Sequence, residues 1–75
     1  MSQSGSFAVR AELPGIVAEV MVTAGRAVEA GAPLVLLDSM KMEIPVLAPR
    51  AGTVRRVVVA PGDRLQQGDL VAVLD

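Results

Sequence analysis

The chain has 75 residues, 52% of them apolar and 20% charged, and a formal net charge of −1, which is the composition of one small globular domain and not of a disordered segment. It contains no Cys, His, Trp or Tyr, so thiolate and imidazole chemistry is excluded, and we expect no catalytic residue and no metal site. The slightly acidic charge and the near absence of aromatic residues argue against nucleic-acid binding. No apolar run approaches the roughly 20 residues of a transmembrane helix, so no membrane association is expected.

Short β-strands separated by turn residues are predicted along the chain. Residues 1–6 are polar and resemble no secretory signal, so a flexible N-terminal tail, a domain over residues 7–75 and a cytoplasmic location are expected. No segment has a sustained helical stripe, and the apolar runs are rich in β-branched residues and bounded by Gly or Pro. In chain order, the clearest predicted strands are Phe7–Arg10, Ile16–Val22, Leu34–Leu37, Ile44–Leu47, Thr53–Val59 and Leu70–Leu74.

An internal repeat organises these strands. Residues 11–38 align without a gap on residues 48–75, and nine of the 28 aligned positions are identical, among them three glycine pairs. Two such copies predict an all-β sandwich, or flattened barrel, of about eight strands in two facing sheets related by a pseudo-twofold axis. The connector between the copies, residues 39–47, is then expected at one pole of the domain and the two termini at the other.

The connector lacks the residues that tight turns normally use. No Gly or Asn occurs between Leu34 and Leu47, although hairpin turns with positive φ strongly favour those residues. The turn must therefore be built around residues 39–42, and strain at such a position often marks a functional site. A wider loop with relaxed dihedral angles is the alternative.

The chain's only lysine, Lys41, lies in this connector between Met40 and Met42. Arginine supplies all six other basic residues, so Lys41 is a candidate for a position that requires a primary amine. Two core methionines beside a solvated lysine are the simpler interpretation. At the extremity of a small domain little core remains, however, so we interpret both methionines as a recognition surface. Asp38 and Glu43, which flank this segment, are interpreted as solvated charges.

The segment Asp38-Ser39-Met40-Lys41-Met42-Glu43 resembles the attachment motif of biotinyl domains, commonly Glu-Ala-Met-Lys-Met. The resemblance extends from about Phe7 to Asp75 and includes Ala48-Pro49, Gly52, Pro61-Gly62-Asp63 and Gly68. It implies two four-stranded antiparallel sheets with the modified lysine at an exposed hairpin tip. The cofactor implied is biotin, joined to Lys41 by a biotin protein ligase, with Met40 and Met42 as the recognition flank.

The resemblance also implies a role in carboxyl transfer. A biotin carboxylase would carboxylate the biotin and a carboxyltransferase would pass the carboxyl group to an acceptor such as an acyl-CoA, as in the acetyl-CoA carboxylase of fatty acid biosynthesis. The chain itself would be a non-catalytic, stand-alone carrier without the inserted thumb of some bacterial carriers. Ser39 and Asp38 depart from the usual Ala and Glu, and we expect these changes to affect ligase efficiency. A lipoyl carrier of a dehydrogenase or glycine-cleavage system and an unmodified β-sandwich module are the alternatives.

Overall fold

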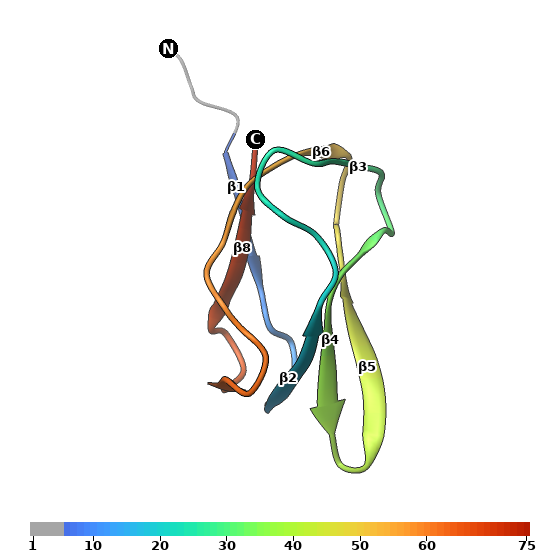
Figure 1. The fold of residues 1–75 in the computed structure, drawn as a ribbon, viewed down its shortest axis with the longest axis vertical. Coiled ribbons are helices and arrows are strands. Elements are labelled where there is room, and N and C mark those ends of the chain that lie inside the picture. The colour runs from blue at the N-terminus through green and yellow to red at the C-terminus, as the bar shows by residue number, and fades with distance from the viewer. Residues whose placement is uncertain (1–5) are drawn as a thin grey trace.

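The computed structural model describes residues 6–75, and strands and loops make up this part of the chain (Figure 1). Within it, no helix is long and apolar enough to span a membrane. Of the predicted tail, residues 1–5 lie outside the described residues, and Ser6 is exposed. The described strands are β1 (Phe7–Arg10), β2 (Gly15–Val20), β3 (Ala27–Val28), β4 (Pro33–Ser39), β5 (Met42–Leu47), β6 (Gly52–Val57), β7 (Arg64–Leu65) and β8 (Leu70–Leu74).

These strands form two four-stranded antiparallel sheets, ordered β1-β8-β6-β3 and β5-β4-β2-β7. The repeat offset of 37 residues maps one order onto the other, so the predicted sandwich of two equivalent sheets is confirmed. Alternate side chains of each strand point inward, and the repeat supplies matched core residues. Val17 and Leu37 from one sheet meet Val54 and Leu74 from the other, and all four are at most 2% exposed.

Reciprocal hydrogen bonds between the two copies hold the sheets together. The amide of Gly25 donates to the carbonyl oxygen of Val54 at 2.7 Å, and the amide of Gly62 donates to that of Val17 at 2.8 Å. Both glycines have a φ of 94°, a conformation that other residues rarely adopt. Each copy therefore sends a loop onto a strand of the other copy, and the barrel requires both.

The strand boundaries differ from the predicted ones at these crossings. The apolar runs predict strands to Val22 and Val59, but β2 ends at Val20 and β6 at Val57. The chain leaves the sheet there because it must pass to the other copy. β3 and β7, two residues each, are the strands formed beyond the crossings, and they are too short to show a period in the sequence. Pro33 begins β4 and Pro45 lies in the edge strand β5, which are positions that tolerate a residue without a backbone N–H.

The β4–β5 turn projects from one pole of the barrel, and the start of β1 and the C-terminus lie at the other pole (Figure 1). This arrangement confirms the prediction made from the repeat. Strands β1 and β8 pair at the second pole as β5 and β4 do at the first, with Phe7 opposite Leu74 and Ile44 opposite Leu37. The hairpin turn thus occupies the place that the two chain ends occupy in the other half.

The hairpin is tied to the loop between β1 and β2 at the end of β4, directly before the turn. Ser39 is only 8% exposed, and its hydroxyl donates a hydrogen bond of 2.7 Å to the carbonyl oxygen of Pro14. Gly15 permits this approach, because a Cβ atom there would lie 2.9 Å from the carbonyl oxygen of Asp38 and 3.3 Å from the Cβ of Ser39. The sequence shows Ser39 only as a departure from a motif, and the structure adds this anchoring contact.

We predict that Ser39→Ala destabilises the domain, because the substitution removes the donor of a part-buried hydrogen bond. The loss is about 1 kcal/mol, which lowers the melting temperature of a domain this small by about 4–8 °C. Thermal melts monitored by circular dichroism measure this change. Thr23→Ala, which removes an exposed loop hydroxyl, is the control. Equal melting temperatures for the two variants would show that the Ser39–Pro14 bond does not hold the hairpin.

Candidate functional site

The turn between β4 and β5 consists of two residues in the left-handed conformation. Met40 has a φ of 53° and Lys41 a φ of 66°, and they are the non-glycine residues with positive φ between residues 6 and 75. Ser39 and Met42 form the last strand pair before them. Two positive φ values in a two-residue hairpin loop define a type I′ turn. The predicted strained turn at residues 39–42 is therefore confirmed, and the wider relaxed loop is excluded.

The turn presents its side chains to solvent. Met40 is 92% exposed and Met42 63% exposed, and Lys41 between them is exposed as well. The interpretation of both methionines as core residues is therefore wrong, because neither lies in the interior. The structure thus brings Met40, Lys41 and Met42 together at one protruding tip, as the sequence predicts.

The electrostatic surroundings of Lys41 are open. Within residues 6–75, no ion pair or hydrogen bond engages its ammonium group. Asp38 and Glu43 lie opposite each other across the hairpin, and both are exposed, as expected of solvated charges. Two like charges in directly opposed positions disfavour pairing slightly, so the sheet gains nothing from these two carboxylates.

At the other pole of the barrel, the carboxylate equivalent to Asp38 has a basic partner. Asp75 is the repeat equivalent of Asp38, and it forms a salt bridge with Arg55 at 3.5 Å. Ala18 occupies the position equivalent to Arg55, so Asp38 has no such partner in the first copy. The tip therefore keeps two carboxylates available to solvent.

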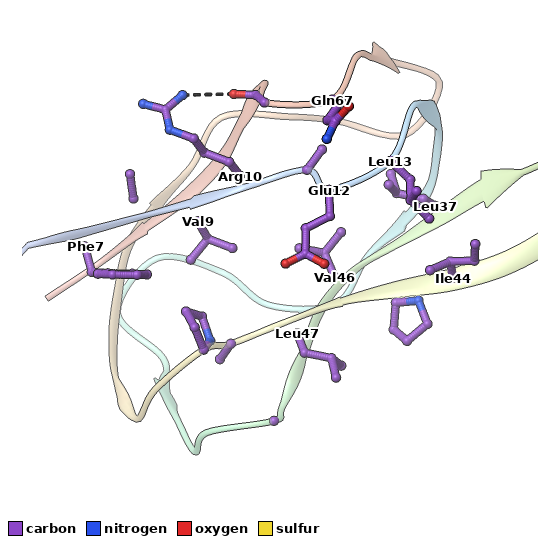
Figure 2. Close-up of a pocket in the computed structure, with 17 residues that line it drawn as sticks. Phe7, Val9, Arg10, Glu12, Leu13, Leu37, Ile44, Val46, Leu47 and Gln67 are labelled. Atoms are coloured by element: carbon purple, nitrogen blue, oxygen red, sulfur yellow. Dashed lines mark hydrogen bonds between the residues drawn. The ribbon is translucent and has the colours of Figure 1, made fainter.

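A groove lies between β1 and β5 on the described surface. Its volume is about 950 Å³, and its lining is mostly apolar. Figure 2 shows Leu13, Leu37 and Ile44 at the end nearer the β4–β5 turn, Phe7 toward the opposite end, and the Glu12 carboxylate turned into the groove. No sequence motif indicates this groove, because its residues come from segments far apart in the chain.

The arrangement at the tip offers a primary amine to which another group can be attached. An accessible primary amine on a rigid projecting turn fits an acyl group that must be reached by other proteins. Among residues 6–75, no cluster of acidic side chains could hold a metal ion. The described site therefore fits a cofactor bound through an amide bond to Lys41, which is the type of linkage that biotin makes through its carboxyl group.

Comparisons with known proteins agree with this geometry. A family profile described as "Biotin-requiring enzyme" matches residues 3–74. A biotinylated protein TB7.3 homolog of Mycobacterium leprae is 56% identical over 66 residues, which are 88% of this chain and 93% of the relative. A biotin/lipoyl attachment protein of Bacillus subtilis is 39% identical over 66 residues, which are 88% of this chain and 90% of that protein.

The fold is also found within a much larger enzyme. A solved structure of a single-chain, multi-domain long-chain acyl-CoA carboxylase superposes with a TM-score of 0.86 and 41% sequence identity. The match covers 97% of this chain but only 7% of the carboxylase, so the likeness concerns one domain of that enzyme. The chain belongs to the family of biotin- and lipoyl-attachment domains, and biotin is the cofactor that its domain carries.

Proposed function

We propose that this chain is a biotin carboxyl carrier and that Lys41 is its attachment residue, linked by an amide bond between its Nζ atom and the carboxyl carbon of biotin. The observation that carries the proposal is the position of the chain's only lysine in an exposed, left-handed turn at the pole of the barrel. No other side chain of the protein offers a primary amine, so the chemistry of the linkage leaves one candidate.

In this proposal the residues of the chain present the attached biotin to partner enzymes. When bound, biotin supplies a ureido nitrogen that takes up a carboxyl group and gives it back. The type I′ turn fixes the Cα of Lys41 at the end of the hairpin, and the lysine stem provides the flexible part of the arm. A short flexible tether keeps its end at an effective concentration in the mM range around the domain. The barrel therefore holds the cofactor near a partner's active site without any catalytic group of its own.

The proposed partners are a biotin protein ligase, a biotin carboxylase and a carboxyltransferase with an acyl-CoA acceptor. The likeness to a domain of the long-chain acyl-CoA carboxylase supports the acyl-CoA class, and acetyl-CoA carboxylase of fatty acid biosynthesis is the system that we propose. Because the M. leprae relative is matched over 93% of its length, we further propose a stand-alone subunit. A cytoplasmic location remains part of the same proposal.

Charge supports recognition of the modified tip by basic surfaces. Conversion of the Lys41 amine into an amide removes one positive charge, so the formal net charge of the chain falls from −1 to −2. The tip then carries Asp38 and Glu43 without a cation, and both carboxylates are exposed. Opposite charges steer diffusional encounter between partners, so basic residues around a partner's active site would favour the modified form.

Lipoylation of Lys41 is the second candidate. The similarity to a protein of B. subtilis named for both biotin and lipoyl attachment supports it. The residue before the lysine opposes it, because the chain has Met40 where lipoyl domains usually have Asp. The two candidates differ in the group attached and not in the residue that carries it.

We predict that Lys41 is the sole modified residue. After expression beside the native ligases, intact-mass spectrometry should show the mass of one biotinyl group on the wild-type chain and none on Lys41→Arg. The variant should melt like the wild type, because arginine keeps the charge and the exposed position. Biotin on Lys41→Arg would refute the assignment, and a lipoyl increment on the wild type would favour the second candidate.

We also predict that the methionines serve recognition more than packing. Met40→Ala should change the stability by no more than about 0.5 kcal/mol, whereas truncating a buried methionine costs about 2–5 kcal/mol. The rate of biotinylation by the purified ligase should nevertheless fall. Met42→Ala should behave similarly, with a larger effect on melting because Met42 is less exposed. Met21→Ala, a partly exposed methionine outside the tip, is the control. Strong destabilisation together with a normal rate of biotinylation would restore a packing role.

A further inference from the structure

We propose that the apolar end of the groove between β1 and β5 is an intramolecular resting position for the biotinyl group on Lys41. This inference rests on the proposed attachment at Lys41. The occupant is the chain's own modified side chain, whose valeryl stem and fused rings are largely apolar. The walls of the resting position are formed by Leu13, from the loop between β1 and β2, and by Ile44 of β5.

The apolar surface begins next to the turn. Met42 and Ile44 are two residues apart in β5, so their side chains share the inner face of the hairpin, together with Leu37 opposite Ile44. Met42 is 63% exposed, and Ile44 is partly exposed at the mouth of the groove. An apolar track therefore runs from the residue after Lys41 into the groove.

Leu13 closes the other side of this track. Its side chain is 45% exposed and lines the groove with Leu37 and Ile44, at the end nearer the turn (Figure 2). The hydrogen bond from the Ser39 hydroxyl to the carbonyl oxygen of Pro14 holds the neighbouring residue of the loop against the hairpin. The loop therefore holds Leu13 in a fixed position beside β4 and β5.

The pseudo-symmetry shows that the two ends of the groove differ in chemistry. Phe7 is the repeat equivalent of Ile44, and Arg50 is that of Leu13. At the pole of the chain ends the Arg50 guanidinium lies over the Phe7 ring, 4.9 Å from its centroid. A cation thus covers the apolar ring there, whereas at the Lys41 pole both equivalent residues are aliphatic and one of them is 45% exposed.

The length of the arm selects one end of the groove. Ile44 is three residues from Lys41, or roughly 10 Å along the strand. The extended arm from the Cα of lysine to the biotin rings spans about ten bonds, or roughly 13 Å. Leu47 lies six residues from Lys41, at roughly 20 Å, and is out of reach. The groove also contains a hydrogen-bond acceptor for the ureido N–H groups, since the Glu12 carboxylate turns into it (Figure 2).

Methyl NMR spectra of the modified and unmodified protein test this inference. With biotin verified on Lys41 by mass, we expect shifts at the methyl groups of Leu13 and Ile44 and nuclear Overhauser contacts between those methyls and the biotin ring protons. The Leu47 methyls should stay unchanged. Leu13→Gln should abolish the contacts, whereas Leu47→Gln, at a site that is 48% exposed, should keep them.

Capture of the biotinylated protein by avidin provides a second measurement, because biotin must leave the groove before it is bound. If the resting position is occupied half of the time, Leu13→Gln should raise the association rate about twofold and Leu47→Gln should leave it unchanged. Shifts confined to residues 39–43, or equal capture rates for the wild type and Leu13→Gln, would overturn this inference alone. Absence of biotin from Lys41 would overturn the proposed function and this inference with it.

Discussion

The reciprocal docking of the two repeats is the constraint on which the rest of the structure depends. The amides of Gly25 and Gly62 donate to the carbonyl oxygens of Val54 and Val17, respectively. A loop of each copy is therefore hydrogen-bonded to a strand of the other copy. A barrel closed in this way is stiff enough to hold one hairpin beyond its end. The Ser39–Pro14 hydrogen bond fixes the end of β4 directly before the turn, and this contact positions Lys41.

The strained turn lowers the stability of the domain. Two non-glycine residues in the left-handed region cost on the order of 1–2 kcal/mol each, within a total stability of about 5–15 kcal/mol for a natural domain. Glycine or asparagine would relax the backbone, but neither supplies a primary amine or the soft, polarisable contact surface of methionine. Met40 and Lys41 occupy these strained positions, and we interpret their exposed side chains as the reason that glycine or asparagine is not used there.

Much of this arrangement could be predicted from the sequence because the repeat contains long-range information. The offset of 37 residues predicts the paired sheets, the two poles and the exposed connector with Lys41. The early ends of β2 and β6 could not be predicted, because Val22 and Val59 continue an apolar run while tertiary contacts redirect the chain. The Ser39–Pro14 hydrogen bond and the groove at Leu13 depend on contacts between distant segments. No periodicity or motif in the sequence indicates such contacts, so they could not be predicted.

We propose that the chain carries a carboxyl group on the biotin linked to Lys41 and that it catalyses no step alone. Labelled bicarbonate measures this directly, using mass-verified biotinylated protein, ATP, a biotin carboxylase and then a carboxyltransferase with an acyl-CoA. We expect no label on the protein alone, labelling once the carboxylase is added, and passage of the label to the acyl-CoA once the carboxyltransferase is added. Labelling of the unmodified chain or of Lys41→Arg, or turnover by the biotinylated protein without partners, would contradict it.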